Sequence, residues 1–98
     1  CVVKPLALSA SRGVIRCDDA SALFSACARI EPMLSDSGDE FEKRHLLIES
    51  YIEGVEVAYE GFLRQGTLCT LVIFDKPDPL TGPYFEETIY VTPSALPV

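Results

Sequence analysis

The sequence predicts an α+β fold, in which one helix follows two short strands and the remaining strands pair mainly with their neighbours along the chain. Three observations support this class. A stretch near residue 20 has apolar residues at helical spacing, and two strand-like runs flank a Gln-Gly pair. Short apolar runs near both ends are bounded by proline or glycine. The predicted order is strand–strand–helix–strand, then three more strands, which is an α+β pattern.

The first part of the chain is predicted to hold two strands. Residues 1–6 form the first one, because its β-branched valines favour extended backbone and Pro5 ends it. Residues 7–13 are predicted to be a loop, and residues 13–17 a second short strand. A hairpin-like start of this kind brings the two strands together around an exposed loop.

The helix is expected to begin at Ala20, with Asp18 or Asp19 as its N-cap. Pro32 should end or kink it, and residues 35–44 are predicted to be a polar loop. The side of the helix that faces the core is predicted from its apolar residues, which are Leu23, Phe24, Cys27, Ile30 and Leu34.

The second part of the chain is predicted to be strands only. Residues 45–54 form a strand that we expect to be buried on both faces near its start, because its alternation is imperfect. Residues 55–77 form a hairpin that turns at Gln65-Gly66. A last short strand is expected at Glu87–Val91.

Composition excludes several classes of function. The chain of 98 residues has a formal net charge of −7, so it repels the phosphate backbone that supplies most of the affinity for nucleic acids. No apolar run is long enough to cross a bilayer, so no membrane partner is expected. The 4 cysteines include no C-x-x-C pair and there is 1 histidine, which argues against a zinc site and favours free thiols in a reducing cytosol. We therefore expect a cytoplasmic protein.

The first candidate motif is Lys4-Pro5 and the loop that follows it. Small residues let backbone N–H groups approach an anion, and a lysine at a strand end adds a fixed cation, a combination that suits phosphate oxygens. The alternative is an ordinary hairpin with an exposed lysine. The small loop residues are Ser9, Ala10, Ser11 and Gly13.

The second candidate motif is ESYIEGVE at residues 49–56. Its three glutamates, Glu49, Glu53 and Glu56, surround an apolar Tyr-Ile pair. Carboxylates can accept hydrogen bonds from an adenine amino group and from a ribose diol. The alternative is a strand that leaves the core and carries solvated glutamates.

The two motifs together, about 45 residues apart with a helix between them, resemble the ATP-grasp superfamily over about residues 2–94. The resemblance is strongest to members similar to phosphoribosylglycinamide synthetase, biotin carboxylase and dipeptide-forming ligases. It implies an ATP-dependent ligase that joins a carboxylate to an amine or thiol through an acylphosphate, with ATP and Mg²⁺ as cofactors. The expected partners are therefore small-molecule carboxylate and amine substrates, and the assembly state is left open, a homo-oligomer included.

The resemblance also assigns roles to individual residues. Lys4 matches a lysine that contacts the phosphates, and Ser9, Ala10, Ser11 and Gly13 match a mobile loop that closes over them. Glu49 matches the acid that faces the adenine amino group, and Glu56 the acid that binds ribose. The C=O of Ser50 and the N–H of Ile52 match the backbone contacts to adenine. Leu8 and Arg12 depart from the family's loop, where small residues stand.

Lys76 is left open between a phosphate contact and a solvated loop lysine, and Glu86 and Glu87 between the acceptor-substrate side and an exposed loop. The family's metal-binding acid, its Glu-x-Asn pair and its catalytic arginine are not found in this sequence, so the metal ligands are expected outside it. No residue here is predicted to be catalytic.

The chain is therefore expected to be a partial ATP-grasp domain truncated at both ends, and this segment alone is expected to be inactive. Residues 1–52 would form the small ATP-binding lobe and residues 53–98 the start of the second lobe. The alternative function is a non-catalytic acidic interaction module with exposed apolar edges.

Overall fold

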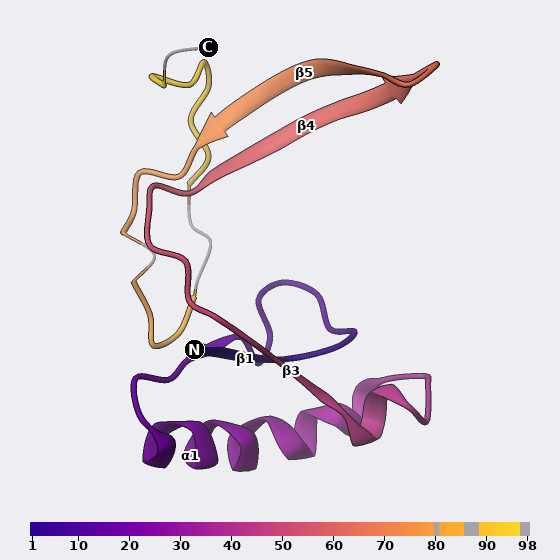
Figure 1. Cartoon of the computed structure of the whole chain (residues 1–98), viewed down its shortest axis with the longest axis vertical. Coiled ribbons are helices and arrows are strands. Elements are labelled where there is room, and N and C mark those ends of the chain that lie inside the picture. The colour runs from indigo at the N-terminus through magenta and orange to yellow at the C-terminus, as the bar shows by residue number, and fades with distance from the viewer. Residues whose placement is uncertain (80, 86–88, 97–98) are drawn as a thin grey trace. The chain divides into compact units, whose positions relative to one another are not determined.

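A computed structural model describes residues 1–79, 81–85 and 89–96, and it confirms the predicted α+β class (Figure 1). The described residues fall into two compact units, residues 1–52 with 81–85 and residues 53–79 with 89–96. The elements in chain order are β1 (Val2–Pro5), β2 (Ile15–Arg16), α1 (Ala20–Ile30), the 3-10 helices η1 (Glu31–Asp36) and η2 (Glu42–Arg44), β3 (Leu46–Glu49), β4 (Val57–Arg64) and β5 (Thr67–Asp75).

The first unit is built on a three-stranded antiparallel sheet with the order β2-β1-β3. In the central strand, Val3 and Pro5 are buried, while Val2 and Lys4 are partly exposed. This alternation follows from the two-residue period of a strand. One face of the sheet is therefore covered and the other is open.

Helix α1 covers the buried face of the sheet (Figure 1). Asp19 is its N-cap, as one of the two predicted alternatives, and its carboxylate accepts a hydrogen bond of 2.8 Å from the backbone N–H of Ala22. The helix ends at Ile30, where the predicted effect of Pro32 appears as a change from α-helix to the 3-10 helix η1. The core consists of Val3, Ile15, Cys17, Ala26, Ile30 and Leu34.

Phe24 was predicted to face the core, and this prediction is wrong, because the residue is 76% exposed. The buried line of the helix passes through Ala26 and Ile30, with Leu23 and Cys27 at its sides. Phe24 precedes Ala26 by two residues, which is about 200° around the helix axis. Its size suggested burial, but its position places it on the outer side.

Strand β3 and the segment before it also differ from the expectation. The strand is shorter than residues 45–54, and it is not buried on both faces, because Leu47 and Ile48 are exposed. It is one of the two edge strands of the sheet, and of its residues Leu46 packs against the core.

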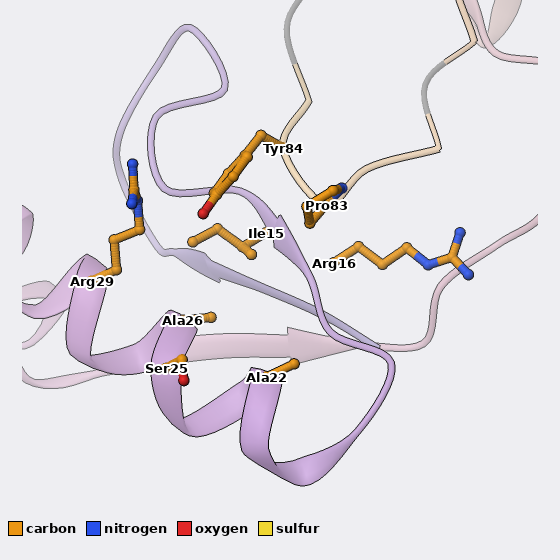
Figure 2. A pocket seen from close by; sticks show the side chains of 8 residues that line it. All are labelled: Ile15, Arg16, Ala22, Ser25, Ala26, Arg29, Pro83 and Tyr84. Carbon is orange, nitrogen blue, oxygen red and sulfur yellow. The ribbon is translucent and has the colours of Figure 1, made fainter.

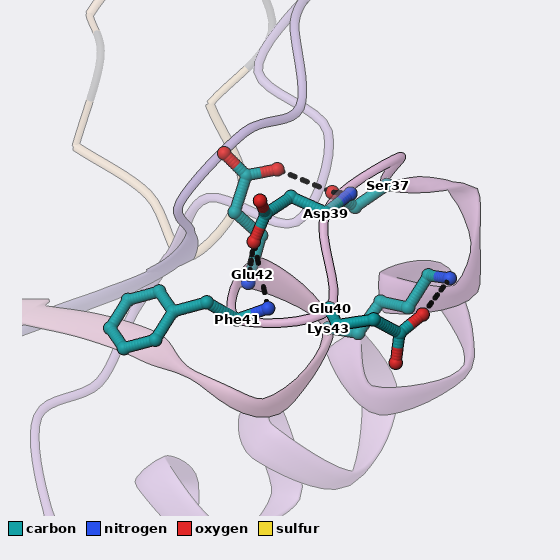
Figure 3. Close-up of polar contacts among 6 residues, drawn as sticks. All are labelled: Ser37, Asp39, Glu40, Phe41, Glu42 and Lys43. Atoms are coloured by element: carbon teal, nitrogen blue, oxygen red, sulfur yellow. Dashed lines mark hydrogen bonds and ion pairs between the residues drawn. The ribbon is translucent and has the colours of Figure 1, made fainter.

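The predicted polar loop 35–44 contains the end of η1 and all of η2. Its geometry follows from one carboxylate, since Asp39 accepts hydrogen bonds from the backbone N–H of Phe41 at 2.7 Å and of Glu42 at 3.2 Å (Figure 3). An aspartate in this position satisfies donors that a short helix leaves unpaired.

The second unit contains the predicted hairpin of β4 and β5, and the turn at Gln65-Gly66 is confirmed. Both turn residues have positive φ, 50° and 79°, as a two-residue type I′ turn requires. The pairing shifts between Glu60 and Gly61. A Cβ at Gly61 would lie 2.7 Å from the carbonyl oxygen of Cys69, so the close approach of the strands at this irregularity requires glycine.

The end of β5 is joined to the last described segment through Asp75. Its backbone forms a two-way bridge with Val91, with N···O distances of 2.8 and 3.0 Å. Its carboxylate accepts hydrogen bonds from the N–H of Ala95 and the hydroxyl of Ser94, and these bonds hold the pKa of Asp75 below its usual range. Of the predicted strand Glu87–Val91, the first two residues lie outside the described residues, as does Glu86.

The buried line of α1 generates a paired stability prediction. Ile30→Val removes one methyl group from a side chain that is fully buried, so it should lower the free energy of unfolding by about 0.5–1.5 kcal/mol. Phe24→Ala removes a larger but exposed side chain and should change it by less than about 0.5 kcal/mol. Urea unfolding followed by circular dichroism measures both. A larger loss for Phe24→Ala than for Ile30→Val would contradict the assignment of the core face.

Candidate functional site

The loop between β1 and β2 has an unusual backbone. Two consecutive turns shape it, one closed by the N–H of Arg12 donating to the carbonyl of Ser9 at 3.3 Å, and one by the N–H of Val14 donating to that of Ser11 at 3.2 Å. Ala10 and Ser11 have φ angles of 57° and 56°, in the left-handed region that residues with a side chain seldom adopt. Such strain often accompanies a binding or catalytic role.

Gly13 fixes the same loop to the body of the first unit. Its φ is 75°, and a Cβ at this position would lie 3.0 Å from the ring of Pro5 and 3.5 Å from Cγ1 of Ile30. The predicted loop glycine thus has a packing reason as well as a conformational one. A second tether is the ion pair of Arg12 with Asp36, at 2.5 Å, which connects the loop to η1.

Lys4 and Glu49, which the family resemblance assigned to the phosphates and to adenine, form an ion pair in the structure. Lys4 alternates with the buried residues of β1, so its side chain lies on the open face of the sheet. The two side chains are 35% and 47% exposed, and a pair this accessible contributes at most about 1 kcal/mol to stability. Ser50 and Ile52 follow β3 directly and are exposed.

Arg16 belongs to this open face and was missed by the sequence analysis. In the register of the sheet, Val2 lies between Arg16 on one side and Glu49 on the other. The guanidinium lies 4.1 Å from the ring centroid of Tyr51. A single arginine in a short strand gives no signal of its own, and only the strand pairing brings it to the segment after β3.

The guanidinium of Arg16 is further held by two hydrogen bonds. Its Nε donates to Asp18 at 2.8 Å, and its Nη1 donates to the backbone carbonyl of Thr81 at 3.1 Å. The hydrogen bond to Asp18 raises the pKa of Arg16, so this arginine is a permanent cation. Its contacts connect β2, the segment after β3 and residues 81–85.

The remaining two predicted site residues, Glu56 and Lys76, lie in the second unit and form an ion pair with each other. The side chain of Lys76 is only 10% exposed, and its ammonium lies 5.5 Å from the ring centroid of Tyr90. Lys76 is therefore not a solvated loop lysine, which was one of the two alternatives from the sequence.

The contacts of two other reactive side chains, His45 and Cys17, indicate structural roles. His45 stacks on Phe41 with ring centroids 3.9 Å apart, and burial raises the pKa of the Cys17 thiol, which disfavours its reactive thiolate form. Within residues 1–79, 81–85 and 89–96, no group of three or more His, Cys, Asp or Glu residues could hold a metal ion. In the same residues, no helix has the length and apolar character needed to cross a membrane.

The loop backbone generates a prediction with opposite signs at two positions. Gly13→Ala places a side chain against Pro5 at positive φ and should lower the free energy of unfolding by more than about 1 kcal/mol. Ala10→Gly relieves a left-handed residue that costs about 1–2 kcal/mol, so even after the larger entropy loss of glycine it should not destabilise the chain. Urea unfolding of both variants measures this difference. Equal losses would show that the loop does not hold these angles in solution.

The comparisons with known proteins agree with these features. A family model described as ATP-grasp domain matches residues 1–98, which is the whole chain. No curated protein and no solved structure gives a significant match. The match confirms the resemblance drawn from the Lys-Pro strand, the small-residue loop and the ESYIEGVE segment. The chain belongs to the ATP-grasp family.

Proposed function

We propose that this chain supplies part of the ATP site of a ligase that activates a carboxylate as an acylphosphate for attack by an amine. The family supports an ATP-binding, ligase-type function in general. The observation that carries the proposal further is the pair Lys4–Glu49 on the open face of the sheet, at the base of a loop with consecutive left-handed residues. A cation, a carboxylate and a small-residue loop in one place suit the phosphate and adenine ends of one nucleotide.

Lys4 would exchange its partner when ATP binds. The ion pair with Glu49 is accessible to solvent and costs little to break, whereas a charge-assisted bond to a phosphate oxygen is among the stronger hydrogen bonds in proteins. Glu49, released from Lys4, would then accept from the adenine amino group. In the absence of nucleotide, the pair keeps both side chains on the same face of the sheet.

The loop would supply backbone donors. Arg12 and Val14 use their N–H groups inside the two turns. Within the described part of the chain, the N–H groups of Ala10, Ser11 and Gly13 make no backbone hydrogen bond of this kind, so they are the donors available to phosphate oxygens. Small side chains at these positions let the anion approach the backbone.

The reaction needs no protein nucleophile. A carboxylate oxygen of the substrate attacks the γ-phosphorus of ATP, the bond between this phosphorus and the bridging oxygen breaks, and ADP leaves with the electron pair. The amine nitrogen then attacks the carbonyl carbon, inorganic phosphate leaves, and the amine proton passes to solvent. In such transfers the protein contributes mainly position and positive charge, which is the role proposed for Lys4 and, in the second unit, for Lys76.

Magnesium is the metal that the family implies. Mg²⁺ prefers carboxylate oxygens together with phosphate oxygens and water. The two carboxylates of the predicted site, Glu49 and Glu56, each form an ion pair with a lysine, and no cluster of three possible ligands exists among residues 1–79, 81–85 and 89–96. The carboxylates of these residues therefore do not fit the ligand set that Mg²⁺ requires.

Lys4→Met in the ligase that contains this domain tests the phosphate assignment. The substitution keeps an unbranched apolar side chain and removes the charge, so the dissociation constant of ATP should rise about tenfold or more. The free energy of unfolding should change by less than about 1 kcal/mol. Calorimetric titration with ATP in magnesium-containing buffer and a thermal melt measure the two effects.

Lys43→Met is the matched control, since Lys43 also forms an ion pair on the surface of the first unit, with Glu40 at 2.7 Å (Figure 3). It should leave the dissociation constant unchanged. If Lys4→Met binds ATP as well as Lys43→Met does, the residues between β1 and β2 form only a hairpin loop.

Glu56→Gln tests the ribose assignment with two nucleotides. Loss of a charged acceptor costs about 1.5–3 kcal/mol when a hydrogen bond to it is removed, so the affinity for ATP should fall by roughly tenfold or more. An analogue without ribose hydroxyls, 2′,3′-dideoxy-ATP, should bind the variant and the parent equally. Glu56 also pairs with Lys76, so the substitution could disturb this part of the chain in general. Such a disturbance would lower the affinity for both nucleotides equally, and that result would overturn the assignment.

A further inference from the structure

A groove of about 300 Å³ lies in the first unit between α1, β2 and residues 83–84 (Figure 2). One wall is the helix, through Ala22, Ser25 and Ala26, and its floor includes Ile15. Its size is at the lower end of the range for sites that hold small molecules.

The groove lies mostly on the side of the sheet that α1 covers, opposite Lys4, and only Arg16, at one end of the groove, comes from the open face. Ile15 pairs with Val3 across the sheet, and both are buried on the side that α1 covers. Lys4 follows Val3 and lies on the open side. A ligand in this groove would therefore not occupy the nucleotide site proposed above, and the inference does not depend on that proposal.

Short side chains keep the groove open, and backbone contacts hold its far wall in place. On α1, Ala22, Ser25 and Ala26 recur at three- and four-residue spacing and so share one side of the helix. Opposite them, the N–H of Arg16 donates to the carbonyl of Pro83 at 2.9 Å, and Tyr84 forms a bridge with Ile15. The width of the groove is thus set by the helix on one side and by the hydrogen-bonded backbone of residues 83–84 on the other.

The charge at the groove comes from Arg29. Arg16 and Arg29 lie at opposite ends of the groove, with Tyr84 between them (Figure 2). The guanidinium of Arg16 is already hydrogen-bonded to Asp18 and to Thr81. Arg29 is 5.0 Å from the ring centroid of Tyr84, and no carboxylate of residues 1–79, 81–85 or 89–96 pairs with it.

An arginine in this environment favours the binding of an anion. In a chain of net charge −7, five of the eight lysines and arginines form ion pairs with carboxylates, whereas Arg29 lies at an apolar groove beside an aromatic ring. A guanidinium is weakly hydrated and has a planar fork that matches a carboxylate. The ring of Tyr84, together with Pro83 and the alanines, offers apolar surface to the remainder of the molecule.

We propose that this groove binds a small organic acid. Its carboxylate pairs with Arg29, and its flat apolar body lies against Pro83, Tyr84 and the alanine side chains of α1. Both features are required, because one exposed arginine alone holds an anion only weakly and the groove alone is too small to hold a neutral molecule tightly.

Benzoate is a suitable probe, and benzyl alcohol is its neutral counterpart with the same ring. In an NMR titration of the methyl groups of Ile15, Ala22 and Ala26, benzoate should give saturable shifts. Benzyl alcohol should bind with an affinity at least about tenfold lower. No saturable shift with benzoate, or equal binding of the two compounds, would overturn the proposal.

Two pairs of variants separate charge from space. Arg29→Gln should lower the affinity for benzoate about tenfold. Arg44→Gln, at another exposed arginine of the same unit, should leave it unchanged. Ser25→Leu should fill the groove and abolish binding, whereas Ser21→Leu, also exposed on α1 but outside the groove, should retain it. Leucine favours helix more than serine, so both leucine variants should fold.

Lys4→Met provides the final comparison, because it should leave benzoate binding unchanged. A loss of benzoate binding in Lys4→Met would place the organic acid on the open face and overturn the groove site, whatever the outcome for ATP. Undiminished binding in Arg29→Gln or Ser25→Leu would overturn it as well.

Discussion

The first unit depends on a single constraint, which is that one helix can cover only one face of its three-stranded sheet. Val3 of the central strand and Ile30 of α1 are both completely buried in the resulting core. Because a strand alternates its side chains, burial of Val3 and Pro5 determines that Lys4 lies on the other face. The proposed nucleotide site uses the open face, and the groove lies mostly on the covered side, so both follow from this division.

Local sequence signals predicted the parts of the fold that local chemistry decides. Asp19 caps the helix through its own carboxylate, and Gln65-Gly66 adopts the positive φ values that a tight hairpin needs. Burial was harder to predict, because it depends on which elements pack together. Phe24 and Ile48 are apolar but 76% and 53% exposed, so their hydrophobicity predicted the wrong environment.

The candidate site shows the same limit. Residue type and spacing identified Lys4 and Glu49 separately, but their contact depends on the register between β1 and β3, whose paired residues are far apart in the sequence. Arg16 could not be found in this way, because nothing near it in the sequence distinguishes it from a solvated arginine. The position of Arg29 beside Tyr84 likewise requires the return of residues 81–85 to the first unit, which no motif indicates.

That return gives the chain an inserted topology. In the sequence, the hairpin of the second unit comes between two segments of the first, so Tyr84, which bridges to Ile15, follows the hairpin along the chain. During synthesis, the edge of β2 therefore stays uncovered until residue 84 has left the ribosome. The length of the hairpin should matter little to this closure, because Val57 pairs with Asp75 at its base and holds the two ends of the hairpin together whatever its length beyond. The hairpin can thus lengthen or shorten in evolution while the first unit keeps its edge covered.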